Sequence, residues 1–262
     1  YQGKTLTDVV KENPNFLGEN GKKFEYFPIL IKLIDAKNDL SVQVHPDNEY
    51  AMRVENEYGK TECWYILDCD DDAELIYGFN REISSEEFKE RISNNTFLET
   101  VNKVKVKKGD LFFIEAGTLH AIGKGILLAE IQQNSNTTYR VYDYGRLGAD
   151  GKPRELHIEK AIDVTNCIPP TRSTKPEGEL VVENGYTSQL LTKCDLFNVE
   201  KVSVTNTYTS TADDKSFVSV LVTDGEGKIV NIEIKKGDSL FIPANYGDFT
   251  VTGNVEIIIT RV

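Results

Sequence analysis

The sequence has few of the features that mark membrane or nucleic-acid-binding proteins. No apolar run approaches the roughly 20 residues of a membrane-spanning helix, so we predict no membrane partner. The 30 Lys and Arg residues are outnumbered by 42 Asp and Glu, which gives a formal charge of -12, and the lysines do not cluster. Because binding to a phosphate backbone needs a basic patch, we also predict no nucleic-acid partner.

Cysteine is scarce, and its spacing predicts no disulfide framework. Cys63, Cys69, Cys167 and Cys194 form no CxxC pair, and a chain of 262 residues does not need disulfide bonds to fold. We therefore expect reduced thiols in a cytoplasmic protein. The chain opens with Tyr1 and shows no signal peptide, so we expect that an upstream segment has been lost.

From Phe27 onward, most of the chain is typical of short strands. β-Branched and aromatic runs such as "TECWYILDCD" and "GILLAEIQQNS" are cut by Gly, Asp, Asn or Pro, as in an antiparallel sandwich or barrel. A capped helix is predicted as an insertion near 84–99, with Ser84 or Ser85 as its cap. A second helix is predicted over 155–164.

An internal repeat indicates two similar domains. "VKVKKGDLFFIEAGTLHAI" at 104–122 recurs as "IEIKKGDSLFIPANYGDFTV" at 232–251. We therefore predict a mainly β protein made of two antiparallel jelly rolls. Gly247 and Asp248 stand in the second copy where the first has His120, so any chemistry is expected in the first copy.

The predicted domain boundary follows the second helix. The connector "CIPPTRSTKPEGEL" is rich in Pro, Ser and Thr. We place a metal-binding domain, which includes the helical insertion and ends with the second helix, at 1–165. A domain without metal ligands is placed at 166–262.

The stretch "SVQVHPD" puts an amide and an imidazole on one side of a strand. Side chains alternate along a strand, so Ser41, Gln43 and His45 share one face while Val42 and Val44 share the other. The valines are expected to lie in an apolar core. Amide and imidazole then point together to the opposite side.

Three further positions extend this pair to a candidate metal site. Glu62 lies in the next predicted strand, and His120 follows a Gly-Thr corner in a third. Gln43, His45, Glu62 and His120 offer an amide oxygen, two imidazoles and a carboxylate, which suits one zinc ion. Taken singly, each is more often structural, but the spacing of Gln43 from His45 favours the metal.

The stretch "AEIQQNSNTTYRVYDYGR" supplies a second polar cluster. Glu130 and Gln132 share a strand face, and Arg140 follows after a polar turn. This pattern is common at a polar sheet edge that carries an ion pair. An arginine in such a place can also hold a phosphate or stabilise an oxyanion. His157, in a charged helix, is interpreted as a solvated or capping residue.

With these residues identified, the sequence resembles the cupin-type mannose-6-phosphate isomerases, in particular their short bacterial branch. The matching stretches are "LSVQVHPDNEYA", "GKTECWYIL", "GTLHAIGKGILLAEIQQNSNTTYRVYDYGR" and "RELHIEKA". They cover the middle half of the chain closely, whereas the C-terminal part matches more loosely. The resemblance implies that the two jelly rolls are cupin-like.

The family holds a single zinc ion with Gln, His, Glu and His, which the resemblance places on the four candidate ligands. Its catalytic arginine corresponds to Arg140, and Lys60 and Glu130 correspond to residues that line its pocket. The implied reaction interconverts mannose 6-phosphate and fructose 6-phosphate through a cis-enediol. Lys60 and Glu130 are the two candidates for the proton-transfer base, and Lys60, Arg140 and Arg146 are the local candidates for holding the phosphate.

The sequence departs from the family in three places. The long branch carries His-Lys-Pro-Glu where this chain has "GKTE" at 59–62, so no role is transferred to that histidine. Glu115 replaces a frequent proline, and we expect only the local turn to change. An N-terminal segment with additional strands, usual before "GKTLTDV", is not in this sequence, so we expect part of a sheet to be missing.

Two other functions stay open. A non-catalytic sugar-phosphate-binding cupin with a structural metal would show a closed metal site. A cupin dioxygenase would hold iron on two histidines and a carboxylate. Gln43 as a fourth ligand and the nearby cations argue against the dioxygenase.

Overall fold

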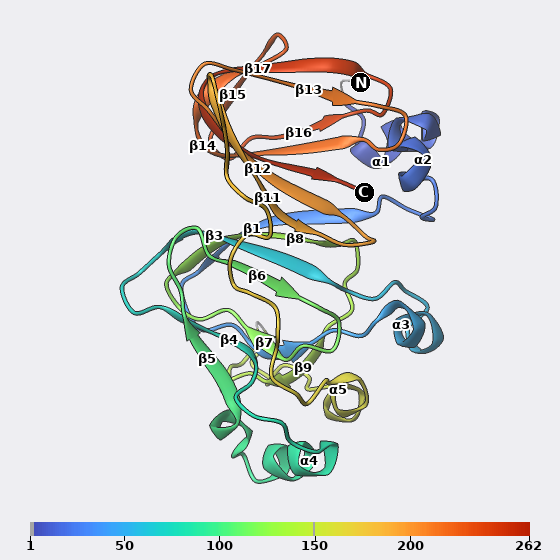
Figure 1. Cartoon of the computed structure of the whole chain (residues 1–262). Helices are drawn as coiled ribbons and strands as arrows, with labels where there is room; N and C mark the ends of the chain where they lie inside the picture. The colour runs from blue at the N-terminus through green and yellow to red at the C-terminus, as the bar shows by residue number, and fades with distance from the viewer. Residues whose placement is uncertain (1–2, 149) are drawn as a thin grey trace. The chain divides into compact units, whose positions relative to one another are not determined.

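The chain forms two compact units in the computed structural model, which describes residues 3–148 and 150–262. One unit spans Leu30–Lys175, and the other joins Tyr1–Ile29 to Pro176–Val262. Figure 1 shows that both are built mainly from antiparallel strands, as the sequence predicts. The predicted boundary at residue 165 differs from this division, in which the unit ends at Lys175 and the described residues from 3 to 29 group with the C-terminal part of the chain.

The unit Leu30–Lys175 contains two sheets. The strand order is β1-β8-β3-β6 in the four-stranded sheet and β5-β4-β7-β2-β9 in the five-stranded sheet. The strands are β1 (Ile29–Ala36), β2 (Val42–Val44), β3 (Glu62–Cys69), β4 (Glu74–Phe79), β5 (Val101–Lys105), β6 (Leu111–Ile114), β7 (His120–Ala121), β8 (Ile126–Gln133) and β9 (Tyr139–Tyr142).

Helices cover one face of the five-stranded sheet. Val42 and Val44 are fully buried in one apolar cluster with Phe88 of α4 (Ser85–Ser93) and Ala161 of α5 (Ile158–Val164). The valines of "SVQVHPD" therefore face this helical layer, as their alternation predicts. Gln43 is left on the opposite face.

The predicted helical insertion is present, and its cap can now be assigned. The Ser84 side chain accepts a hydrogen bond from the Glu87 backbone N–H at 3.1 Å, so Ser84 caps α4. A short 3₁₀ turn, η2 (Phe97–Glu99), follows. The connecting helix α5 begins at Ile158 instead of at Glu155, because the backbone of His157 is still bonded to the edge strand β9.

The second unit is built around one eight-stranded sheet. Its main path is β10-β11-β12-β17-β14-β15, with β13 paired to β17 and β16 paired to β14. The elements are α1 (Leu6–Glu12), η1 (Pro14–Leu17), α2 (Gly18–Gly21), β10 (Val181–Glu183), β11 (Tyr186–Lys193), β12 (Asn198–Val204), β13 (Thr207–Ala212), β14 (Val218–Ile229), β15 (Ile232–Lys235), β16 (Ser239–Ile242) and β17 (Gly247–Arg261). The remaining helix of the chain, α3 (Asn48–Val54), belongs to the other unit.

The sequence repeat is also a structural repeat. In both copies the Lys-Lys-Gly-Asp segment forms the same turn, and its glycine has a φ of 92° (Gly109 and Gly237). The first lysine donates its backbone N–H to the aspartate side chain at 2.9 Å in each copy, Lys107 to Asp110 and Lys235 to Asp238.

Strand register shows what the second roll has in place of the candidate glutamate ligand. Glu62 lies opposite Ile114 in the β3·β6 pair, and Val218 lies opposite Ile242 in the β14·β16 pair. Val218 is fully buried in an apolar cluster. A valine has no atom that binds a metal, so this position of the second roll cannot act as Glu62 does.

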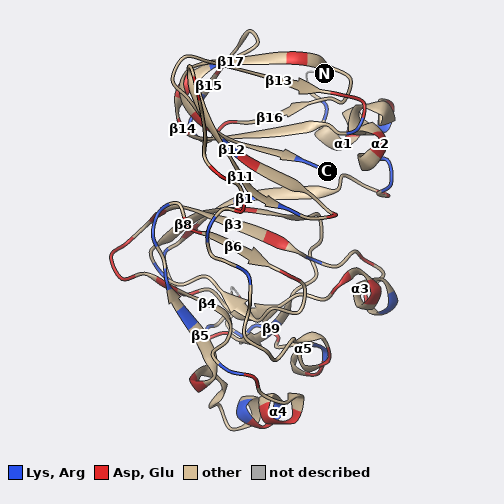
Figure 2. Ribbon diagram, in the orientation of Figure 1, with Lys and Arg blue, Asp and Glu red and all other residues tan. Residues whose placement is uncertain are grey.

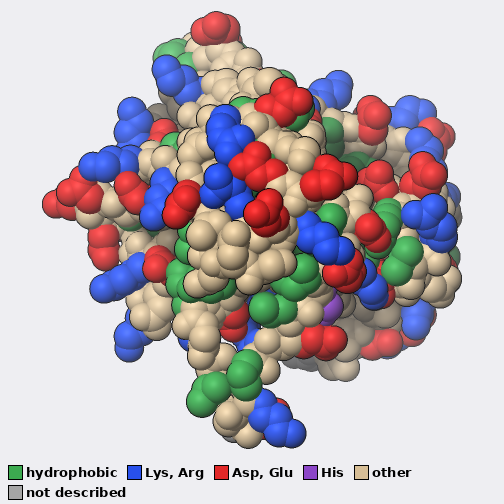
Figure 3. Space-filling model, turned by 90° about the horizontal axis from the view of Figure 1, so that it is seen from below, with side chains coloured by type: hydrophobic (Ala, Val, Ile, Leu, Met, Phe, Trp, Pro, Cys, Tyr) green, Lys and Arg blue, Asp and Glu red, His purple; other side chains and the backbone are tan. Residues whose placement is uncertain are grey.

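Charged residues are spread over the chain without segregation by sign. Figure 2 shows them mostly in loops and in helices such as α3, α4 and α5, while most of the strands carry few. On the face drawn in Figure 3, acidic and basic side chains are interspersed. Among the described residues, no helix has both the length and the apolar character needed to cross a membrane.

Candidate metal centre

The five-stranded sheet places three of the predicted site residues in one row. Gln43 lies opposite His120 in the β2·β7 pair and opposite Arg140 in the β2·β9 pair. Directly paired residues in an antiparallel sheet point to the same face. His120, Gln43 and Arg140 therefore share the face that the helices do not cover.

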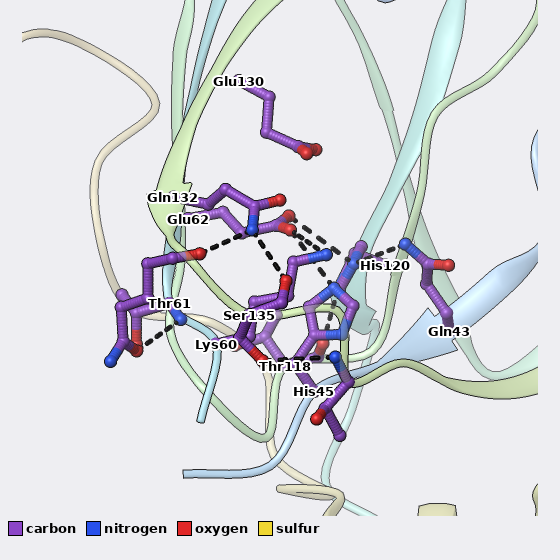
Figure 4. A network of polar contacts seen from close by, with 12 residues as sticks. Gln43, His45, Lys60, Thr61, Glu62, Thr118, His120, Glu130, Gln132 and Ser135 are labelled. Carbon is purple, nitrogen blue, oxygen red and sulfur yellow. Dashed lines mark hydrogen bonds and ion pairs between the residues drawn. The ribbon is translucent and has the colours of Figure 1, made fainter. Parts of the chain in front are cut away.

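The four-stranded sheet contributes a matching set of polar residues. Glu62 lies opposite Gln132, and Trp64 lies opposite Glu130, in the β3·β8 pair. Figure 4 shows Glu62, Glu130 and Gln132 on one side of the site, and His120 and Gln43 on the other. The site thus lies between the two sheets of the same unit.

Three of the four predicted ligands come together in the interior. The candidate ligand atoms of His45, Glu62 and His120 all lie within 4.8 Å of one another, and all three residues are buried. His45 Nε2 is 3.3 Å from Glu62 Oε1, and His120 Nε2 is 3.9 Å from Glu62 Oε2. Two atoms that each bind one zinc ion at about 2 Å are separated by about 3 to 4 Å, so these distances fit a shared ion.

The hydrogen bonding of the two imidazoles supports this fit. Neither ring nitrogen of His45 makes a hydrogen bond within the described residues, although the side chain is buried. Buried polar atoms without partners are rare, and a metal ion would supply a partner for Nε2, the nitrogen that faces Glu62. His120 Nδ1 donates to the Thr118 carbonyl at 2.8 Å, which makes Nε2 the unprotonated nitrogen that can bind a metal.

Gln43 lies beside this group with its amide nitrogen toward His120. The distance from Gln43 Nε2 to His120 Nε2 is 3.4 Å. To bind a metal, the amide would turn by about 180° so that its oxygen took the place of the nitrogen. Its role as the fourth ligand stays a prediction.

The surroundings favour protonation states that suit a cation. Burial, followed by the charge of Lys60, lowers the pKa of His45 to about 3, and burial also lowers the pKa of His120. Burial acts to raise the pKa of Glu62, but the neighbouring His45 and Lys60 outweigh it and hold that pKa well below the usual range. Neutral imidazoles and an ionised carboxylate are the forms that bind metals.

Lys60 and Glu130 flank the three ligands. Lys60 Nζ is 2.8 Å from Glu62 Oε1, and the lysine is buried. Glu130 accepts a hydrogen bond from Trp64 Nε1 at 2.9 Å. Burial, together with the charge of Glu62, raises the pKa of Glu130.

Lys32 of β1 is a site residue that the sequence interpretation missed. Its Nζ lies 2.8 Å from Glu130 Oε1 and 2.5 Å from Gln132 Oε1. The available signal was a single lysine in the otherwise apolar run "FPILIKLI". A charge in such a run is expected to meet a partner inside the fold.

Arg140 is the least neutralised of the neighbouring arginines. Its Nη1 donates to the Glu155 carbonyl at 2.8 Å, and its buried Nε has no hydrogen-bond partner among the described residues. Burial, followed by the charge of Arg154, lowers its pKa. Arg146 and Arg154, by contrast, both pair with the buried Asp143.

His157 lies against β9 and holds the backbone of Arg140. Its ring Nδ1 accepts the Arg140 backbone N–H at 3.2 Å, and its own backbone N–H donates to the Arg140 carbonyl at 2.8 Å. It occupies the N-cap position of α5 but makes no side-chain cap hydrogen bond. The prediction that the His157 side chain caps the helix is therefore wrong, although the residue is half-buried and stands at the N-cap position.

The chain is similar to proteins of known activity over its whole length. A model described as the phosphomannose isomerase type I catalytic domain matches residues 1–94, and one described as the mannose-6-phosphate isomerase cupin domain matches residues 187–262. Mannose-6-phosphate isomerase ManA of Bacillus subtilis (strain 168) is 43% identical over 268 residues, covering 100% of this chain and 82% of the relative. The mannose-6-phosphate isomerase of Streptococcus mutans serotype c is 39% identical, covering 98% of this chain and 81% of the relative.

The fold has a close match among solved structures. The crystal structure of the mannose 6-phosphate isomerase from Bacillus subtilis superposes with a TM-score of 0.92 at 37% sequence identity. The match covers 100% of this chain and 83% of that one. The fold of this chain is thus shared with that protein.

Proposed function

The chain belongs to the mannose-6-phosphate isomerase family, and from that premise we propose that it is a zinc-dependent aldose-ketose isomerase that interconverts mannose 6-phosphate and fructose 6-phosphate. The observation that carries the proposal is the buried group His45, Glu62 and His120, with Lys60 and Glu130 on its flanks. A metal site with proton-transfer groups beside it suits isomerisation better than a purely structural role.

The ligand types favour zinc. Two imidazoles and one carboxylate, with the amide of Gln43 as a fourth donor, include no thiolate and leave a site of net positive charge. When bound, a zinc ion would polarise the oxygens of the sugar as a Lewis acid. We propose one zinc ion per chain, because Val218 replaces Glu62 at the matching position of the second roll.

Glu130 is the base that the contacts favour. The reaction removes the proton from C2 of mannose 6-phosphate and delivers one to C1, passing through a cis-enediol. A carboxylate whose pKa is raised by burial is suited to accept and return such a proton, whereas Lys60 is paired with Glu62 at 2.8 Å. Lys60 then supplies positive charge toward the enediolate oxygens.

Arg140 lies on the sheet face that carries His120 and Gln43, and we propose that it stabilises the enediolate or holds the phosphate. Its guanidinium is not neutralised by a carboxylate within the described residues, unlike those of Arg146 and Arg154. A sugar phosphate is the proposed partner. We propose neither nucleic acid nor membrane as a partner, and a cytoplasmic location, from the composition and the cysteine pattern.

The first test is isomerase activity before and after removal of the metal. Conversion of mannose 6-phosphate to fructose 6-phosphate should disappear on chelation and return when zinc is added back. His120→Ala should lose both zinc and activity. Asp248→Ala, at the matching position of the second roll, should lose neither.

Either of two results would contradict the proposal. Folded, zinc-loaded protein without isomerase activity would favour the alternative of a non-catalytic sugar-phosphate-binding cupin with a structural metal. Activity that survives complete removal of the metal would contradict the zinc dependence alone.

A further inference from the structure

The indole of Trp64 touches three residues of the metal centre. Its Nε1 donates to Glu62 Oε2 at 3.0 Å and to Glu130 Oε2 at 2.9 Å. Its ring meets that of His120 edge to face, with the centroids 5.2 Å apart and the planes at 81°. Trp64 is fully buried, and it is the only tryptophan in the chain.

One N–H thus serves two carboxylates. An indole has a single donor and no acceptor, so Glu62 and Glu130 share one proton of Trp64. Figure 4 shows the carboxyl groups of both glutamates on the same side of their strands. Two buried like charges repel each other, and a shared donor between them fixes their separation.

The other oxygen of each carboxylate forms an ion pair with a lysine. Lys60 Nζ is 2.8 Å from Glu62 Oε1, and Lys32 Nζ is 2.8 Å from Glu130 Oε1. The result is a chain of contacts in the order Lys60, Glu62, Trp64, Glu130, Lys32. Because both ends are pinned by cations, the indole in the middle determines how far one carboxylate lies from the other.

We propose that Trp64 is a positioning residue that couples the metal ligand Glu62 to Glu130, so that both carboxylates are oriented by one indole N–H. The positioning of Glu62 by Trp64 requires only that His45, Glu62 and His120 hold the metal. For Glu130 it rests on the proposed function, in which that carboxylate transfers the proton. The backbone supports this role, because Trp64 lies directly opposite Glu130 in the β3·β8 pair.

The test compares Trp64→Phe with Tyr77→Phe. The first variant keeps an aromatic ring against His120 but removes the shared N–H. The second removes another buried side-chain hydrogen bond, from the Tyr77 hydroxyl to the Phe113 carbonyl at 2.9 Å, which touches no ligand carboxylate. Both residues belong to the same apolar cluster, so the pair controls for general loss of packing.

We expect Trp64→Phe to weaken zinc binding about tenfold or more in calorimetric titration, as loss of a partner of a metal ligand does. Its kcat should fall by about tenfold or more while KM changes little, since orientation of Glu130 is lost and sugar binding is not. Tyr77→Phe should leave the zinc affinity and kcat within about twofold of the parent values. Thermal unfolding of both metal-free variants reports whether they fold.

A second measurement uses the parent protein and no substrate. Because Trp64 is the only tryptophan, all tryptophan emission comes from this position. Adding zinc to the metal-free protein should change the emission and saturate at one zinc per chain. This result does not depend on which reaction the protein catalyses.

Three results would overturn the inference. They are an unchanged zinc affinity in Trp64→Phe, an equal loss of affinity in Tyr77→Phe, and zinc binding without any change in emission. An inactive parent protein would contradict the proposed function, while the zinc affinities and the emission would still decide the link between Trp64 and Glu62. A normal kcat in a Trp64→Phe variant with weakened zinc binding would overturn the part that concerns Glu130.

Discussion

At the scale of single residues, the candidate metal centre is marked by buried polar atoms that lack a hydrogen-bond partner. His45 has no hydrogen bond on either ring nitrogen, and Arg140 has none on its buried Nε, within the described part of the chain. Glu62 Oε1 likewise has no hydrogen bond among the described residues, although Lys60 Nζ lies 2.8 Å from it, whereas Glu130 is hydrogen-bonded on both oxygens. The incomplete groups are therefore those expected to gain a partner when metal or sugar phosphate binds.

Replacing Arg140 by Ala should reduce turnover without releasing zinc. The guanidinium supplies positive charge and touches none of the three ligand residues in the contacts described, so we expect kcat/KM to fall by about 10²-fold or more. Zinc content measured on the purified variant should equal that of the parent. Arg140→Lys keeps the charge but loses the planar fork, and we expect it to retain more activity than Arg140→Ala.

A zinc-free Arg140→Ala protein would contradict this prediction. It would show that Arg140 maintains the structure of the centre and not the charge in the pocket. Loss of zinc from Arg140→Lys as well would support that structural role.

The residues that the sequence revealed are those marked by local alternation. Gln43 and His45 are separated by a valine that belongs to the core, so strand geometry alone predicts that they point together. No comparable alternation along a strand identifies Lys32 or His157 as site residues. Lys32 reaches Glu130 across 98 residues of sequence, and the contact of His157 with Arg140 depends on where α5 begins, which the sequence places three residues too early.

At the scale of elements, the repeated Lys-Lys-Gly-Asp turn connects corresponding strands in the two rolls. The glycine of each turn donates its backbone N–H to the neighbouring long strand, Gly109 to Ile66 of β3 and Gly237 to Val222 of β14. Both glycines have the same positive φ, and a Cβ added to either would meet no atom within 4 Å. Any cost of a side chain at these positions is therefore backbone strain and not a clash.

Gly109→Ala and Gly237→Ala should destabilise the protein by similar amounts. A left-handed conformation costs an L-residue about 1 to 2 kcal/mol, and neither turn has a clash to add to it. Hydrogen exchange should locate the effect, with faster exchange in the Leu30–Lys175 unit for the first variant and in the other unit for the second. Zinc affinity should be unchanged in both.

Gly123→Ala provides the contrast for this pair. A Cβ there would lie 1.8 Å from the Glu74 carbonyl oxygen, so we expect a much larger loss of stability. Equal losses in all three variants would contradict the strain argument.

Elements defined by short-range patterns were predicted well, and those defined by distant contacts were not. The Ser84 cap and the repeated turn depend on neighbours within a few residues, and both are confirmed. The association of the first 29 residues with the C-terminal unit depends on distant contacts. The Asn20 side-chain amide donates to the Val262 carbonyl, and the Ala244 backbone N–H donates to the Phe16 carbonyl. No local sequence pattern predicts either hydrogen bond.

At the scale of the whole molecule, a net charge of -12 coexists with a cation-rich centre. The acidic residues are distributed over the chain, and the field of exposed charges is screened beyond roughly 8 Å at physiological salt. Lys32, Lys60 and Arg140 act at shorter range in and around the site. The overall charge therefore does not prevent a sugar phosphate from binding there.

Zinc should stabilise one unit of the molecule. At a zinc concentration 100 times its dissociation constant, binding to the native state alone contributes about 2.7 kcal/mol, which slows exchange through opening of the metal-binding unit about 100-fold. We expect this protection at amides of β2, β3 and β7, which carry or adjoin the ligands. Amides of β14 and β17 should not show it, because Val218 and Asp248 hold the corresponding positions.

Hydrogen exchange with and without zinc measures this difference directly. His120→Ala is the control and should show no zinc-dependent protection in either unit. Equal protection of β14 and β17 in the parent would contradict the assignment of the metal to the first roll, and its persistence in His120→Ala would place a zinc ligand in the second. The repeat would then mark two metal sites, whereas Val218 at the position of Glu62 predicts one.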